Sequence, residues 1–216
     1  KNPARPGKHP FHAAGLYYLQ EPSAMLAAEI LSPLPGERVL DLCAAPGGKA
    51  THLASLLAGE GLLIANDVHP QRVWHLSENL ERWGICNAIV LNETPERLAE
   101  HFGAYFDKVL VDAPCSGEGL FRKEPLVRQI WTPEMPDGCA IRQLRILETA
   151  ARMVKPGGRI VYSTCTFNPQ ENEAVIARFI DGNPDFELVD PGIIPGTTRA
   201  RPEWVSERSV SSLNRA

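Results

Sequence analysis

The chain has 216 residues, of which 44% are hydrophobic and 22% are charged, and these values are typical of one globular domain with a substantial core. Its formal net charge of -4 at pH 7 argues against a protein that holds nucleic acid by bulk positive charge. No apolar run reaches the length of about 18 residues that a membrane-spanning helix needs, and no signal-peptide pattern is present. We therefore expect a cytoplasmic protein that makes no membrane contact.

The cysteine pattern argues against two kinds of site. The five cysteines are odd in number and widely spaced, and no two of them form a C-x-x-C pair. The sequence therefore predicts neither a disulfide framework nor a zinc site, and we expect no metal. The thiols are then reduced and available for catalysis.

The beginning of the chain predicts an arm followed by a helix. Residues 1–15 are rich in Pro, Lys, Arg and His without periodicity, which is typical of an irregular basic arm. An aromatic pair, Tyr17 and Tyr18, comes next and fits either the lining of a pocket or core packing before a helix. That helix is predicted over residues 23–31 because prolines follow it.

A strand, a turn and a second strand together indicate a cofactor site. Residues 38–42 predict a short buried strand, and the turn Cys43-Ala44-Ala45-Pro46-Gly47-Gly48-Lys49 leads into a helix over residues 49–57. Small residues in such a turn let a ligand approach the backbone amides at the helix start. The second strand, residues 62–67, ends at Asp67, where a carboxylate can accept hydrogen bonds from ribose hydroxyls. We interpret this set as a nucleoside-cofactor site rather than a structural turn.

Strands and helices continue to alternate up to about residue 190. Further strands are predicted over residues 88–91, 108–111 and 160–164, with helices over residues 70–83, 95–101, 139–154 and 169–180. The remaining segments are predicted to be a long polar loop over residues 121–137, one more strand over residues 186–189 and an irregular tail over residues 191–216. The predicted fold class is therefore α/β, with a mostly parallel, doubly wound sheet.

Two strand ends carry side chains suited to catalysis. The strand at residues 108–111 runs into Asp112 and Cys115, and the strand at residues 160–164 is followed by Cys165. Ligands of open α/β sheets bind at the carboxyl ends of strands, so we expect Asp112 and Cys115 to face one crevice. A carboxylate and a thiol there suit nucleophilic or acid–base chemistry, although Cys115 alone fits a small buried cysteine equally well.

Charge is uneven along the chain. Residues 120–160 contain eight basic and four acidic side chains. This excess fits either a solvated helix face or a phosphate-binding face, and the sequence does not decide between them.

Five stretches carry a resemblance to a known family. They are Tyr18-Leu19-Gln20-Glu21-Pro22-Ser23, Asp41-Leu42-Cys43-Ala44-Ala45-Pro46-Gly47-Gly48-Lys49, Asp112-Ala113-Pro114-Cys115-Ser116-Gly117-Glu118-Gly119, Ser163-Thr164-Cys165-Thr166 and Asn168-Pro169-Gln170-Glu171-Asn172-Glu173. Together they resemble the RNA 5-methylcytosine methyltransferases of the Nol/Nop/Sun family over about residues 17–189. Within the family, the sequence is most similar to bacterial enzymes that act on small-subunit ribosomal RNA.

The resemblance implies a fold and a cofactor. The fold would be the Rossmann-like one of class I S-adenosylmethionine-dependent methyltransferases, with residues 16–190 as the catalytic domain. The residues that would bind S-adenosylmethionine are Cys43, Ala44, Ala45, Pro46, Gly47, Gly48, Lys49, Asp67, Arg72, Asn92 and Asp112. Asn92 stands where family members often carry an acid, so its amide carbonyl would contact the adenine amino group.

The resemblance also implies catalytic roles that suit the chemistry of cytosine. Carbon 5 of cytosine is a poor nucleophile, and thiolate addition to carbon 6 activates it toward a methyl donor. Cys165 would be that nucleophile and Cys115 would assist product release. Asp112 would hold the base edge, and Lys49 would orient this acid or lower a thiol pKa. The partner would be an unpaired or extruded cytosine of RNA, ribosomal rather than transfer RNA, and we expect a monomer.

The chain departs from the family at its ends, and other functions stay open. Neither the family's N-terminal RNA-binding extension nor its two final strands are recognised, so we expect a fragment or an incomplete gene product. A DNA cytosine-5 methyltransferase would use Cys115 as nucleophile, which the stretch around Cys165 argues against. A scaffold that binds RNA and S-adenosylmethionine without turnover is the third reading. A small-molecule methyltransferase would not need two strand-end thiols.

Overall fold

The computed structural model describes residues 5–192 and 194–205. These residues form two compact units. The first unit runs up to Asp112 and also takes in Thr149–Tyr162, and the second combines Ala113–Glu148 with the described residues from Ser163 onward. Among the residues described, no helix is long and apolar enough to cross a membrane.

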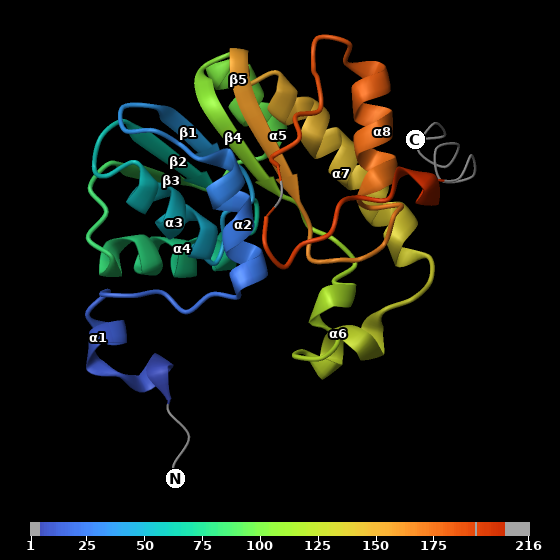
Figure 1. Ribbon diagram of the computed structural model, residues 1–216. Coiled ribbons are helices and arrows are strands. Elements are labelled where there is room, and N and C mark those ends of the chain that lie inside the picture. The colour runs from blue at the N-terminus through green and yellow to red at the C-terminus, as the bar shows by residue number, and fades with distance from the viewer. Residues whose placement is uncertain (1–4, 193, 206–216) are drawn as a thin grey trace. The chain divides into compact units, whose positions relative to one another are not determined.

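The first unit is built on a five-stranded sheet (Figure 1). Its strands are β1 (Arg38–Asp41), β2 (Leu62–Asn66), β3 (Ala88–Leu91), β4 (Phe106–Asp112) and β5 (Val154–Ser163), in the order β3-β2-β1-β4-β5. β1 is parallel to β2 and β4, and β2 is parallel to β3. β5 runs parallel to β4, since Phe106 N donates to Met153 O where both strands begin. The predicted α/β class with a parallel sheet is confirmed.

This strand order places a ligand site. The connections run outward from β1 in one direction and from β4 in the other, so the sheet changes winding direction between these two strands. Open α/β sheets bind ligands at such a switch point, beyond the carboxyl ends of the strands. β1 ends at Asp41 and the neighbouring β4 ends at Asp112, so both acids lie at this edge of the sheet.

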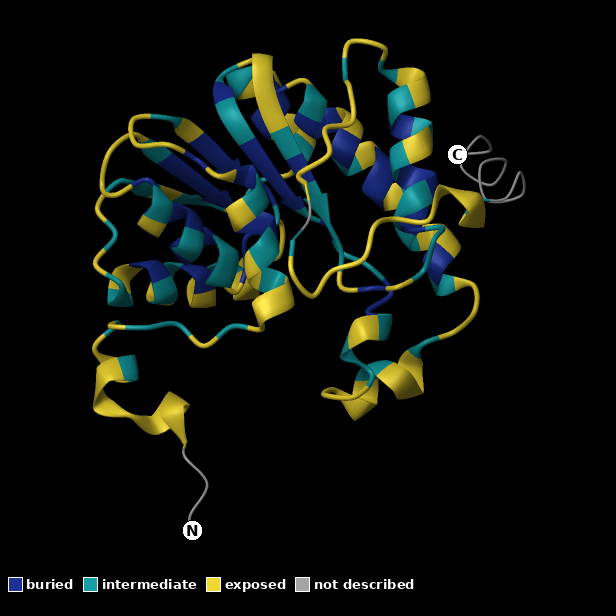
Figure 2. Cartoon of the chain, in the orientation of Figure 1, coloured by how far each residue is buried: buried dark blue, intermediate teal, exposed yellow. Residues whose placement is uncertain are grey.

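Four helices of the first unit begin and end within one residue of their predicted limits. They are α2 (Pro22–Leu31), α3 (Gly48–Leu56), α4 (Pro70–Arg82) and α5 (Pro95–Phe102). Side chains of α2, α3 and α4 pack with strand residues into one hydrophobic cluster that includes Leu31, Leu53 and Val39. The neighbouring strand residue Leu40 faces the opposite side of the sheet and is also buried. Much of the sheet is dark blue in Figure 2, the colour of buried residues. Both faces of β1 are therefore covered, as in a doubly wound sheet.

Two segments predicted to be irregular contain helices. The arm holds a 3-10 helix at Pro6–Lys8 and the short α1 at Pro10–Ala13. The predicted loop over residues 121–137 is wrong, because α6 (Pro125–Ile130) lies within it and α7 (Met135–Ala151) begins before residue 139. Pro10, Pro125 and Pro136 stand in the first turn of their helices, where proline needs no hydrogen bond and its fixed φ is already helical. At these three positions proline marks the start of a helix.

The second unit corrects three further expectations. α8 spans Glu173–Gly182 and starts later than predicted, since Asn168 Oδ1 accepts from Gln170 N and holds a turn instead of a helix. Residues 186–189 form no strand, and Leu188 and Val189 are exposed. The tail, predicted to be irregular over residues 191–216, carries a 3-10 helix at Pro202–Trp204. Residues 193 and 206–216 of this predicted tail lie outside the described residues.

Gly61→Ala is expected to destabilise the first unit much more than Gly59→Ala. Both glycines have a φ of +80° in the connection to β2, so both variants carry the same backbone strain. A Cβ on Gly61 would lie 2.3 Å from Glu37 O, whereas one on Gly59 meets nothing within 4 Å. The added clash with backbone should cost about 1–3 kcal/mol more in the free energy of unfolding. Equal denaturation midpoints for the two variants would contradict this close approach.

Candidate active site

The turn after β1 brings backbone close to a neighbouring segment. Gly47 has a φ of +112°, and Gly48 begins α3. A Cβ on Gly48 would lie 3.0 Å from Tyr18 Cε1 and 3.2 Å from Gln20 Nε2. Glycine at this position therefore leaves room for the side chains of residues 18–20, which pack against the turn.

A cavity of about 260 Å³ lies over this turn. Its lining residues are Tyr18, Leu19, Gln20, Glu21, Ala24, Cys43, Ala44, Ala45, Pro46, Gly48, Lys49 and Asp112. Tyr18 thus lines a pocket, whereas the Tyr17 hydroxyl donates to Pro6 O at 2.6 Å. The stretch before α2 was not among the predicted site residues, although an aromatic side chain next to Gln20 and Glu21 was its signal.

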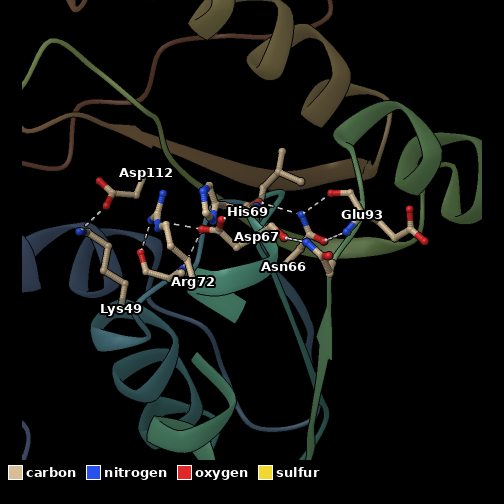
Figure 3. A network of polar contacts seen from close by, with 10 residues as sticks. Lys49, Asn66, Asp67, His69, Arg72, Glu93 and Asp112 are labelled. Carbon is tan, nitrogen blue, oxygen red and sulfur yellow. Dashed lines mark hydrogen bonds and ion pairs between the residues drawn. The ribbon is translucent and has the colours of Figure 1, made fainter. Parts of the chain in front are cut away.

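Lys49 and Asp112 form an ion pair at this cavity (Figure 3). Lys49 Nζ lies 2.6 Å from Asp112 Oδ2, and both side chains are partly buried. Lys49 comes from the first turn of α3 and Asp112 from the end of β4. The contact holds the Asp112 carboxylate, and the catalytic role of Lys49 stays a prediction.

The other predicted cofactor residues form a separate polar network, also drawn in Figure 3. The buried Asp67 carboxylate accepts from Ala45 N at 3.2 Å and His69 N at 3.0 Å, and it pairs with Arg72 at 3.2 Å. Arg72 also donates to Ala45 O at 2.5 Å, and Asn92 Nδ2 donates to Asp67 O at 2.7 Å. This network ties the tip of β2 to the turn after β1. Asp67, Arg72 and Asn92 are not part of the cavity lining.

Asn66 holds backbone segments together beside this network, which the sequence interpretation missed. Its buried amide donates to Leu42 O at 3.2 Å and to Glu93 O at 3.0 Å, and its Oδ1 accepts from Glu93 N at 3.0 Å. It thereby joins the ends of three strands. Its only sequence signal was its position next to Asp67.

Asp41 is a buried acid at the end of β1. It is fully buried, and neither carboxylate oxygen has a hydrogen-bond partner of good geometry. Burial, together with the nearby Asp112 and Asp67 carboxylates, raises the pKa of Asp41 to about 8 against the opposing effect of Lys49. Asp41 is therefore largely protonated at neutral pH. Burial likewise raises the pKa of Cys43, so this thiol is not a nucleophile.

The second unit contains the two predicted catalytic cysteines, and it brings them together. Cys115 Sγ lies 3.0 Å from Cys165 Sγ, and Cys165 N donates to Cys115 Sγ at 3.3 Å. The hydrogen bond with Cys165, together with burial, raises the pKa of Cys115. Cys115 therefore keeps its proton and can donate it in a hydrogen bond to Cys165.

Three pairings of predicted residues are thus present: Lys49 with Asp112, Asp67 with its partners, and Cys115 with Cys165. That Asp112 and Cys115 face one crevice stays a prediction, since they belong to different units. Among the residues described, no group of three or more His, Cys, Asp or Glu side chains could hold a metal ion.

The basic residues between 120 and 160 do not all have the same role. Lys155 pairs with Asp107 at 2.5 Å, and Arg159 donates to Ile30 O at 3.2 Å, both within the first unit. These two contacts stabilise the unit and leave a phosphate-binding role to other members of the set.

Comparison with known proteins yields consistent relatives. The family described as 16S rRNA methyltransferase RsmB/F matches residues 28–201. Ribosomal RNA small subunit methyltransferase F of Escherichia coli O139:H28 (strain E24377A / ETEC) is 39% identical over 196 residues, covering 89% of this chain and 41% of that protein. The chain therefore spans about two fifths of the length of this relative.

Solved structures agree. The crystal structure of PH0851 superposes with a TM-score of 0.84 at 38% identity, covering 94% of this chain and 47% of that one. NSun6 from Pyrococcus horikoshii, solved with SFG, has a TM-score of 0.76 at 31% identity, covering 83% of this chain and 46% of that one.

Proposed function

The chain belongs to the 16S rRNA methyltransferase RsmB/F family, and on this basis we propose that it methylates carbon 5 of a cytosine in RNA. The proposed methyl donor is S-adenosylmethionine and the proposed substrate is small-subunit ribosomal RNA. The names of the E. coli relative and of the NSun6 structure support the substrate and the cofactor class. A cytoplasmic location and a monomeric state stay predictions.

The observation that carries the proposal is the pair of thiols 3.0 Å apart, contributed by the two strand ends. Simple methyl transfer to oxygen or nitrogen needs no thiol, whereas methylation of carbon 5 of cytosine needs a nucleophile at carbon 6. A second thiol in contact with that nucleophile suits a reaction in which the covalent bond must later break.

The proposed reaction assigns one step to each side chain. The Cys165 thiolate adds to carbon 6, forming a carbon–sulfur bond and passing an electron pair to carbon 5, which takes the methyl group from the sulfonium donor. The carbon 5 proton then passes to water, the carbon–sulfur bond breaks and Cys165 leaves as thiolate. A hydrogen bond from the protonated Cys115 stabilises this departing thiolate. Asp112, oriented by Lys49, would hold the cytosine edge.

The cavity over the turn is the proposed cofactor site. Backbone groups at the start of α3 would face the ligand, with Tyr18 and Gln20 as additional lining. The Asp67 carboxylate at the tip of β2 would accept from the ribose hydroxyls, with Asn92 at the adenine. Arg72 holds Asp67 and Ala45 together and would fix this side of the site.

Methyl transfer to RNA is the direct test. The chain is incubated with methyl-labelled S-adenosylmethionine and either unmodified 16S rRNA or DNA of the same sequence, and nucleosides are analysed after digestion. We expect labelled 5-methylcytosine from the RNA only. Label in DNA would favour the DNA-type enzyme, and S-adenosylmethionine binding by calorimetry without label in either polymer would favour the scaffold. Either result would overturn the proposal.

A further inference from the structure

A buried polar network surrounds the loop that carries Cys115. Glu171 and Gln143 are fully buried. The Glu171 carboxylate accepts from Ser116 N at 2.9 Å and from the Ser116 hydroxyl, and Gln143 Nε2 donates to Glu171 Oε2 at 2.9 Å and to Pro114 O at 3.0 Å. Both residues that flank Cys115 are therefore held from this network.

Asn172, which follows Glu171 in the chain, contacts both residues that flank Cys165. Asn172 Oδ1 accepts from the Thr164 hydroxyl at 2.7 Å, and Asn172 Nδ2 donates to Thr166 O at 3.2 Å. Thr164 and Thr166 are the two residues that flank Cys165. One amide side chain thus holds this loop on both sides of the thiol.

The contacts around the Cys115 loop and those around the Cys165 loop are connected to each other. Glu171 and Asn172 are consecutive and directly precede α8, and the Ser116 and Thr166 hydroxyls lie 3.3 Å apart. All of these residues belong to the second unit, so the arrangement is internal to it. Two neighbouring side chains immediately before α8 therefore contact the loops that carry the two sulfur atoms.

We propose that Glu171 and Asn172 are positioning residues that divide the work, Glu171 orienting Cys115 and Asn172 orienting Cys165. The inference rests on the proposed function and adds two residues that act through the loops around the thiols. A reaction slows strongly when its reacting thiol is displaced by about 1 Å. The contacts of Asn172 are therefore expected to affect the addition of Cys165, and those of Glu171 the later release assisted by Cys115. Loosening Asn172 should slow formation of the RNA adduct, and loosening Glu171 should slow its breakdown.

The test compares Asn172→Ala and Glu171→Gln in the full chain. With S-adenosylmethionine and 16S rRNA, we follow the RNA-linked protein on denaturing gels and 5-methylcytosine by nucleoside analysis. Asn172→Ala should lower adduct and product together by about tenfold. Glu171→Gln should form adduct at nearly the wild-type rate but retain it, raising the ratio of adduct to product by about tenfold. Glu173→Gln, the same change two residues on, should behave as wild type.

A purely structural role would lower both quantities in parallel for both variants, leaving the ratio unchanged, and that result overturns the inference. If either variant fails to fold, Thr164→Val and Ser116→Ala replace them, because each removes one hydroxyl of the same hold. Alkylation of each thiol by iodoacetamide, read by mass spectrometry without RNA, separates this inference from the proposed function. Asn172→Ala should change the rate at Cys165 and Glu171→Gln the rate at Cys115. Unchanged rates would refute the positioning even if the wild type forms no adduct.

Discussion

Cys165→Ala is expected to abolish both the RNA-linked adduct and methyl transfer, whereas Cys115→Ala is expected to accumulate the adduct. Loss of the nucleophile removes the covalent route and should lower the rate by about 10³-fold or more. Loss of Cys115 removes the hydrogen-bond donor 3.0 Å from the departing sulfur, so the carbon–sulfur bond forms but breaks slowly. The measurement is a denaturing gel of each variant after incubation with S-adenosylmethionine and unmodified 16S rRNA.

The control is Cys86→Ala, a cysteine of the first unit whose thiol donates to Gly84 O. It should form and resolve the adduct at the wild-type rate. An adduct that depends on Cys115 and survives Cys165→Ala would reverse the two roles and favour the DNA-type mechanism.

Asp41→Asn is expected to stabilise the protein, by an amount that grows as pH rises. The pKa of Asp41 is about 8 in the folded protein and 3.8 for an ordinary aspartate. Below about pH 4 both states hold the proton, and between about pH 4 and pH 8 the unfolded chain releases it while the folded protein retains it. The folded state therefore loses stability as pH rises through this window, and above about pH 8 the loss is complete. The neutral amide in Asp41→Asn does not titrate, so the folding stability of this variant does not fall in this pH range.

The gain at pH 8 should be on the order of a few kcal/mol, because each unit of pKa difference corresponds to about 1.4 kcal/mol. Denaturant unfolding of wild type and Asp41→Asn at pH 5 and pH 8 measures it. A stability difference of the same size at both pH values would show that Asp41 is ionised in the folded protein. The prediction also implies that the end of β1 carries an acid that lowers folding stability at neutral pH, as functional sites often do.

Much of the first unit could be predicted from the sequence because its signals are local. β1 and β2 are short apolar runs that end in polar residues, and α4 has regular apolar spacing closed by Gly84. The errors arose where one residue type has two meanings. Proline is common both in loops and in the first turn of a helix. Pro125 and Pro136 therefore do not distinguish the two, and the predicted loop covers α6 and the start of α7.

The candidate site was predictable as a set of residues but not as a set of contacts. Strand ends and glycine turns indicated Lys49, Asp112 and the two cysteines, because topology brings strand ends together. The hold of Gln143 on Glu171 joins residues far apart in the sequence, and no local pattern reports such a pairing. Tyr18 stayed ambiguous for the same reason, since only the folded chain shows what it lies against.

The position of Glu171 and Asn172 immediately before α8 has an evolutionary consequence. Loops on protein surfaces usually tolerate changes in length. Here, one residue inserted or deleted between Thr166 and Glu173 would displace Glu171 and Asn172 together. The contact of Glu171 with Ser116 and the contact of Asn172 with Thr164 would then be lost at the same time. We therefore expect the segment from Thr166 to Glu173 to keep its length among homologues, even where individual residues are substituted.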